Sequence, residues 1–213
     1  MMSDMTSWLL HDDDALVIAA KPAGLLSVPG RGEDKQDCLA ARVQAKFPDA
    51  QVVHRLDMAT SGLMVFARGK SAQRLLGDAF AGRAVSKRYI AVVAGRPAAD
   101  AGEIDLPLAA DWPRRPLQRV DVDGGKPSLT RYRLLSHDEA SNTSRLELEP
   151  VTGRSHQLRV HLMAIGHPIV GDALYAPQAV QALAPRLLLH AQRLTLPHPS
   201  DGHLVSFEHA APF

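Results

Sequence analysis

One short segment concentrates the side chains that could do chemistry. It reads His54-Arg55-Leu56-Asp57-Met58-Ala59-Thr60-Ser61-Gly62, so that an arginine and a carboxylate flank one apolar residue. The polar run at its end is typical of a tight turn, and the segment is therefore expected to present charge on a loop. From spacing alone, the simpler interpretation is that Asp57 caps the turn and Arg55 is a surface charge.

Further motifs along the chain reverse that preference. The segment at Asp57 resembles the active-site motif of the RluA family of pseudouridine synthases, whose pattern is His-Arg-Leu-Asp followed by Thr-Ser-Gly. Three more segments are similar to that family and occur in the same order: Lys21-Pro22-Ala23-Gly24-Leu25, Lys87-Arg88-Tyr89 and Gly153-Arg154-Ser155-His156-Gln157-Leu158-Arg159-Val160-His161. The likeness continues almost to the C-terminus, through Gly166 to Asp172 with Tyr175, Leu188 to Ala191, and His198-Pro199.

The resemblance implies an enzyme that isomerises uridine in structured RNA to pseudouridine without a cofactor. Asp57 matches the catalytic aspartate of the family. A carboxylate suits this reaction because it can stabilise or attack an anomeric carbon, or remove a sugar proton. Arg159 matches the arginine that keeps this carboxylate ionised, and Tyr89 matches the tyrosine that packs on the target base. Arg55 matches the arginine that takes the place of the extruded nucleotide.

Basic residues near these motifs are candidates for RNA contact. The net charge is only +1, but the stretch from Ala79 to Ala99 has no carboxylate, and bases outnumber acids from Asp111 to Arg133. Scattered Lys and Arg residues are more often ordinary surface residues that keep a protein soluble. Trp112 could stack on an unpaired base or form a packed corner with Pro113. The expected phosphate contacts are Arg83, Lys87, Arg88, Arg114, Arg115 and Arg119.

The histidines do not indicate a metal site. His156 and His161 are five residues apart, which does not align on one helical face, and neither a His-Glu-x-x-His motif nor paired cysteines occur. We therefore expect neither metal nor cofactor.

Composition predicts a cytoplasmic protein. Cys38 is the single cysteine and cannot form an intrachain disulfide. A secretory signal is absent, and no apolar run is long enough to cross a bilayer. We expect a monomer in which residues 1–213 form one catalytic domain. The resemblance to the family implies that this domain acts without the N-terminal S4-like domain of many relatives, and that its partners are 23S ribosomal RNA and a transfer RNA anticodon stem-loop.

The pattern of the chain predicts an α+β fold. Helices are expected at 37–47, capped by Asp37, at 71–80 and at 154–165. Strands are expected at 15–20, 63–67, 87–94, 129–135, 144–148 and 204–207. Since strands outnumber helices and are often sequential, a mixed, mainly antiparallel sheet with flanking helices follows. The resemblance makes this the pseudouridine synthase fold with a central cleft.

The residues alone leave two alternatives. One is an RNA chaperone without chemistry. Asp57→Ala would separate it from an enzyme, in which this change abolishes isomerisation while largely sparing RNA binding. The other is a carboxylate hydrolase acting on small nucleosides or glycosides, although a second well-placed catalytic acid is lacking.

Overall fold

The computed structural model describes residues 8–213 and divides them into two compact units. Residues 8–87 and 191–212 form unit 1, while residues 88–190 and Phe213 form unit 2. The division falls within two strands, β5 (Ser86–Ala94) and β11 (Leu189–Pro197). Between residues 8 and 213, no helix is long and apolar enough to cross a membrane.

Unit 1 is built on a β-sheet. Its strand order is β1 (Leu9–Asp12), β2 (Leu16–Lys21), β4 (Ser61–Arg68) and β11, with β3 (Ala50–Val52) paired to β4 and β12 (Leu204–Glu208) paired to β11. β2 and β4 pair from Leu16 opposite Ala67 to Lys21 opposite Gly62, and both are almost wholly buried. Because neither strand shows apolar and polar residues in alternation, both faces of this part of the sheet must be covered.

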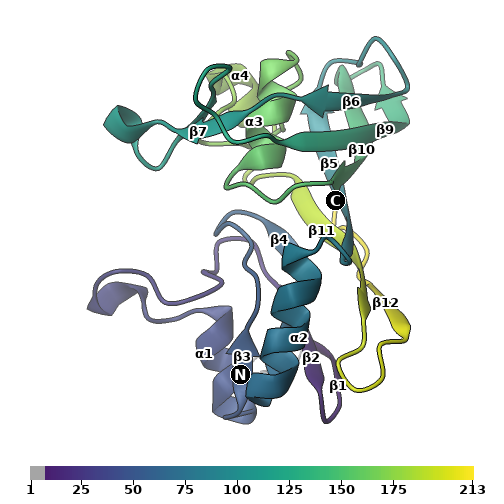
Figure 1. The fold of residues 1–213 in the computed structure, drawn as a ribbon. Helices are drawn as coiled ribbons and strands as arrows, with labels where there is room; N and C mark the ends of the chain where they lie inside the picture. Colours follow the sequence, from purple (N-terminus) through teal and green to yellow (C-terminus); the bar gives the residue numbers. More distant parts are fainter. Residues whose placement is uncertain (1–7) are drawn as a thin grey trace. The chain divides into compact units, whose positions relative to one another are not determined.

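Helices cover the sheet of unit 1 (Figure 1). α2 (Gly69–Ala81) contributes Ala72, Leu76 and Ala79 to a core cluster that also contains Leu16 and Leu63. α1 (Leu39–Lys46) follows the short 3-10 turn η1 (Glu33–Lys35) and buries Leu39, Ala40 and Val43.

Unit 2 has its own antiparallel ladder. The order is β5, β10 (Thr143–Pro150), β9 (Leu129–Asp138) and β6 (Ala101–Asp105). A separate hairpin pairs β7 (Leu108–Ala110) with β8 (Gln118–Val120), and the 3-10 turn η2 (Trp112–Arg114) lies between them. α3 (Gln157–Ala164) lies beside β9 and β10, and α4 (Gln178–Gln181) is a single turn (Figure 1).

The structure confirms the α+β class, and every predicted element is present with bounds shifted by a few residues. Two predicted boundaries are wrong. α1 is capped by Cys38, whose Sγ accepts from the amide of Ala41, while the predicted cap Asp37 pairs with Arg42. α3 begins at Gln157 because His156 has a left-handed backbone, with φ of 55°. The short strands and β11 were not predicted.

His54 is a half-buried structural group of unit 1. It lies just beyond the end of β3. The amide of Val65 in β4 donates to Nε2 of His54 at 3.0 Å, and the His54 ring stacks on Phe80 with centroids 4.7 Å apart. Burial, and then the nearby charge of Lys87, lowers the pKa of His54 to about 3. His54 is therefore neutral in the folded protein near neutral pH, with its proton on Nδ1.

Gly62→Ala should lower the stability of unit 1. Gly62 has φ of +115°, and an added Cβ would lie 2.3 Å from the carbonyl oxygen of Ala191. Strain and backbone collision together predict a loss of about 3 kcal/mol in the free energy of unfolding, measured by urea titration. Gly77→Ala in α2 is the control, since an added Cβ there meets nothing within 4 Å. That variant should gain about 0.5–1 kcal/mol. Equal stabilities of the two variants would contradict this account.

His54→Gln should flatten the pH dependence of stability. The pKa of His54 is about 3 in the folded protein and 6.5 for an unperturbed histidine, so below pH 6.5 the unfolded chain binds a proton that the folded chain does not. The stability linked to His54 is thus complete above pH 6.5 and falls as the pH drops towards 3, by at most about 1.4 kcal/mol per pH unit. Urea unfolding at a series of pH values between 6.5 and 4.5 would measure how the free energy of unfolding depends on pH in the wild type and in His54→Gln. Parallel curves for wild type and variant would show that His54 does not titrate this way.

Candidate active site

Asp57 lies in an irregular loop of unit 1 that connects β3 to β4. Asp57 is half-buried, its neighbour Leu56 is buried, and Arg55 is exposed. The amide of Thr60 donates to the carbonyl of Asp57 at 3.1 Å, which closes the predicted turn. The loop thus presents a carboxylate and a guanidinium from a short, turned segment, as the sequence predicts.

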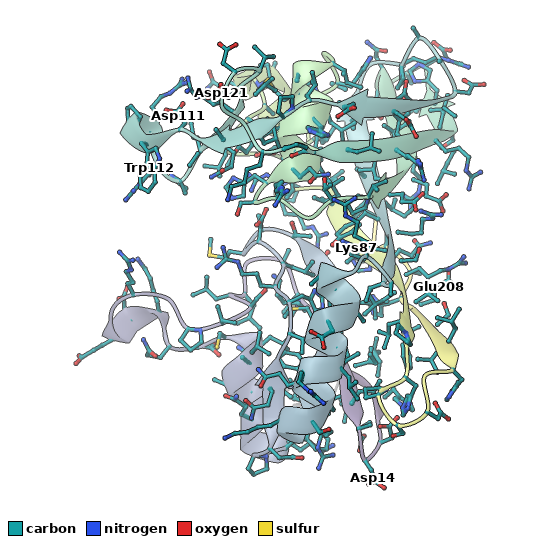
Figure 2. The ribbon with its side chains drawn as sticks, viewed as in Figure 1. Asp14, Lys87, Asp111, Trp112, Asp121 and Glu208 are labelled. Atoms are coloured by element: carbon teal, nitrogen blue, oxygen red, sulfur yellow. The ribbon has the colours of Figure 1, made fainter. Side chains whose placement is uncertain are left out.

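Cations at the end of unit 1 differ in their exposure. Arg83 follows α2 with a left-handed backbone, φ of 60°, and is exposed. Lys87 is half-buried at the start of β5, and burial lowers the pKa of its ammonium group (Figure 2). A partly desolvated cation gains more from a phosphate than a fully hydrated one does.

Two predicted site residues lie next to each other on β5 in unit 2. Tyr89 is half-buried and stands opposite Leu148 of β10. Arg88 forms an ion pair with Glu149, with Nη1 2.5 Å from Oε2. The strand therefore turns these two neighbouring side chains to opposite faces of the ladder.

Arg159 is a buried charge on α3. It is only 4% exposed, and its Nε and Nη2 donate to the two carboxylate oxygens of Asp172 at 2.8 and 2.6 Å. Asp172 is 1% exposed and also accepts from the amides of Leu174 and Tyr175. This two-point contact fixes the plane of the guanidinium. Asp172 lies in one of the segments that resemble the family, but nothing in its spacing from Arg159 indicates this contact.

Tyr175 completes the surroundings of Arg159. The guanidinium carbon lies 5.0 Å from the centroid of its ring, and its hydroxyl accepts from the amide of Gln118 at 2.9 Å. Nδ1 of His156 lies 2.6 Å from the same hydroxyl. Tyr175 therefore connects the start of α3 to the β7–β8 hairpin.

The predicted basic loop is the tip of that hairpin (Figure 2). Trp112 is 66% exposed, which rules out a packed corner, and the guanidinium of Arg115 lies over its ring at 3.4 Å. Arg114 pairs with buried Asp111 at 2.6 Å, and Arg119 pairs with Asp121 at 2.8 Å. The tip thus exposes a flat stack of indole and guanidinium between two ion pairs.

The histidines considered for metal binding have other partners. His161 uses Nδ1 with Thr130 and Nε2 with the carbonyl of Leu106, both at 2.9 Å, and burial lowers its pKa. Within residues 8–213, the side chains that could jointly hold an ion are His198, Asp201 and His203, whose ligand atoms lie within 4.8 Å of one another. They are in the turn between β11 and β12, remote in sequence from the predicted catalytic motifs.

Known proteins resemble this chain over nearly its full length. The sequence profile of the family described as RNA pseudouridylate synthase matches residues 15–164. The dual-specificity RNA pseudouridine synthase RluA of Escherichia coli (strain K12) is 50% identical over 208 residues, covering 97% of this chain and 94% of the relative. The protein of the same name from Yersinia pestis is 50% identical over 205 residues, covering 96% and 99%.

Solved structures agree. Human RNA pseudouridylate synthase domain containing 1 superposes with a TM-score of 0.83 at 27% identity, over all of this chain and 87% of the human one. Human RNA pseudouridylate synthase domain containing 4 gives 0.78 at 27% identity, over 98% and 90%. The chain therefore belongs to the RNA pseudouridylate synthase family and isomerises uridine in RNA to pseudouridine.

Proposed function

We propose that this enzyme uses Asp57 as its catalytic carboxylate and modifies two kinds of RNA, 23S ribosomal RNA and a transfer RNA anticodon stem-loop. The observation that carries the first part is the loop, which holds a half-buried carboxylate directly after a buried leucine and beside an exposed arginine. The second part rests on the relatives at 50% identity, whose name describes dual specificity for RNA.

The reaction exchanges one glycosidic bond for another. The bond from C1′ to N1 breaks, the uracil rotates, and C5 bonds to the same C1′. N1 gains a proton and C5 loses one, so the product is an isomer and no redox partner is required. Asp57 acts either by adding to C1′, from which C5 later displaces it, or by taking the C2′ proton to give a glycal. Both routes return the carboxylate unchanged.

Arg159 and Tyr89 are the proposed partners of Asp57. In this proposal the guanidinium of Arg159 keeps Asp57 ionised, since a carboxylate removed from water needs a neighbouring cation. The bidentate contact with Asp172 supports this role because it holds Nε and Nη2 of Arg159 in one orientation. Tyr89 packs on the uracil, and its phenol helps to remove the C5 proton after the new bond has formed.

The remaining cations are proposed to bind RNA. Arg55 fills the space of the extruded nucleotide, because a planar guanidinium can stack and pair with phosphate at once. The hairpin tip adds a stacking platform of Trp112 and Arg115 for an unpaired base. Phosphate contacts are assigned to Arg83, Lys87, Arg88, Arg114, Arg115 and Arg119.

The proposed enzyme acts in the cytoplasm as a monomer, with its two units working as one catalytic domain. Isomerisation changes no oxidation state, and a carboxylate suffices to activate the sugar, so neither metal nor cofactor is included in the mechanism. The buried, unpaired Cys38 is consistent with a reducing compartment.

Asp57→Asn should abolish isomerisation while keeping RNA binding. The amide can neither attack C1′ nor remove a proton, so the single-turnover rate should fall at least about 10³-fold. Because C5 loses its hydrogen, tritium release from RNA carrying [5-³H]uridine measures this step. The substrates are a 23S ribosomal RNA fragment and a transfer RNA anticodon stem-loop, each at enzyme excess.

The matched control is Asp78→Asn, which neutralises an exposed carboxylate on α2 of the same unit and should leave the rate unchanged. Retained activity in Asp57→Asn would refute the assignment of Asp57. Turnover of only one RNA by the wild-type enzyme would refute the dual specificity.

Variants of the hairpin tip should separate stacking from charge. Trp112→Ala should weaken RNA binding by about 1–3 kcal/mol at every salt concentration, because stacking on a base does not depend on counterions. Arg115→Gln should reduce the slope of log Kd against log salt by about 0.7–0.9, as expected when one phosphate contact is lost. Arg193→Gln, which removes a cation paired with Glu208 in unit 1, should change neither quantity. Unchanged affinity in both tip variants would remove the hairpin from the RNA-binding surface.

A further inference from the structure

The loop that carries Asp57 is bound on both sides of this residue by one earlier segment, residues 21–27. On the N-terminal side, Oγ of Ser27 donates to the carbonyl of Leu56 at 2.6 Å and accepts from its amide at 3.0 Å. One hydroxyl thus satisfies both backbone groups of the residue before Asp57. Ser27 and Leu56 are both buried, so water does not compete for these bonds.

On the C-terminal side, the carbonyl of Met58 accepts two hydrogen bonds from the same segment. Nζ of Lys21 donates to it at 2.9 Å, and the amide of Gly24 donates at 2.8 Å. Lys21 also donates to the carbonyls of Pro22 at 2.9 Å and Leu25 at 2.7 Å, so that the ammonium group folds its own segment around itself. Its side chain is 1% exposed. Three carbonyl oxygens match the three N–H donors of an ammonium group, which a neutral side chain could not reproduce.

The segment is itself anchored to regular structure. Lys21 is the last residue of β2, and the carbonyls of Leu26 and Ser27 accept from the amides of Leu39 and Ala40 at the start of α1, at 2.8 and 3.1 Å. These amides belong to the first turn of the helix, which lacks intrahelical acceptors. The position of Asp57 is therefore determined through hydrogen bonds by both β2 and α1.

We propose that Lys21 and Ser27 are positioning residues for the isomerisation, acting as a clamp on the backbone at Leu56 and Met58. This rests on the proposed role of Asp57 and adds a specific claim, that the clamp sets the rate of the chemical step and not the affinity for RNA. A carboxylate displaced by about 1 Å from its reacting atom can lose on the order of 10²-fold in rate. The clamp acts on Leu56 and Met58 through hydrogen bonds to their backbone groups, so replacing Ser27 or Lys21 leaves the side chains of Asp57 and Arg55 chemically intact.

The test compares Ser27→Ala with Ser27→Thr, which keeps the hydroxyl. Single-turnover rates are measured by tritium release from the anticodon stem-loop at saturating enzyme, and Kd for the same RNA is measured by filter binding. Ser27→Ala should lower the rate about 10- to 100-fold with Kd within about twofold of wild type, and Ser27→Thr should recover most of the loss. Lys21→Met should behave as Ser27→Ala does, and Lys21→Arg should recover part of the rate.

Leu76→Ala separates positioning from stability. Leu76 is 1% exposed in the α2 core of the same unit and takes no part in the hydrogen bonds of the clamp, so its truncation destabilises unit 1 through a cavity. At a temperature where urea titration shows all variants folded, Leu76→Ala should keep the wild-type rate.

Three outcomes overturn the proposal: a Ser27→Ala rate equal to that of Leu76→Ala, an effect confined to Kd, or failure of Ser27→Ala to fold at any temperature tested. If Lys21→Met does not fold, the Ser27 pair decides. The role of Asp57 is judged separately, because an inactive Asp57→Asn beside a fully active Ser27→Ala refutes only the clamp.

Discussion

A carboxylate on an irregular loop can do accurate chemistry only if its backbone cannot drift. Residues 53–60 have neither helical nor strand structure, so their polar groups must find partners elsewhere. Ser27, Lys21 and Gly24 supply those partners from about thirty positions earlier in the chain, and the turn at Thr60 closes the loop before β4 begins. This arrangement explains why Lys21 is buried: carbonyl oxygens that must themselves be held in place replace water around its ammonium group.

Unit 2 fixes its proposed catalytic arginine by a related device, with side chains in place of backbone. α3 is buried on nearly every face, and an unpaired guanidinium there would be strongly destabilising. Asp172 offsets the charge in bidentate geometry and is oriented in turn by two amides of the following turn. The ion pair therefore defines one orientation of Arg159. Its role is to fix this orientation and not to raise stability, because buried ion pairs often stabilise a protein no more than apolar residues of equal volume do.

Much of this organisation could be predicted from the sequence, but the contacts that fix the site could not. Long apolar runs such as Leu63–Ala67 identified strands because burial on both faces leaves a plain compositional signal. The sequence does not predict β11, because His190, Gln192 and Arg193 interrupt its apolar residues. The three-residue strands are too short to show a periodic pattern of apolar residues. The motifs located Asp57, Tyr89 and Arg159, whereas the roles of Ser27 and Asp172 depend on hydrogen bonds between residues distant in sequence, for which spacing carries no information. Likewise, Asp37 is a better cap than Cys38 by propensity, but tertiary packing placed the helix start one residue later.

The charge distribution constrains how such an enzyme can recognise RNA. With a net charge of +1, long-range attraction of a polyanion is weak, so discrimination must come from local geometry. Several of the proposed phosphate ligands are already paired with carboxylates, among them Arg88, Arg114 and Arg119. Exposed pairs are worth little in water, so replacing a carboxylate by a phosphate at Arg119 costs about 0–1 kcal/mol and is easily offset. At Arg114 the partner Asp111 is buried and would be left without its cation, which makes that arginine a part of the hairpin's structure first. The stack of Trp112 and Arg115 carries no such penalty, and it is the part of the tip best suited to select an unpaired base.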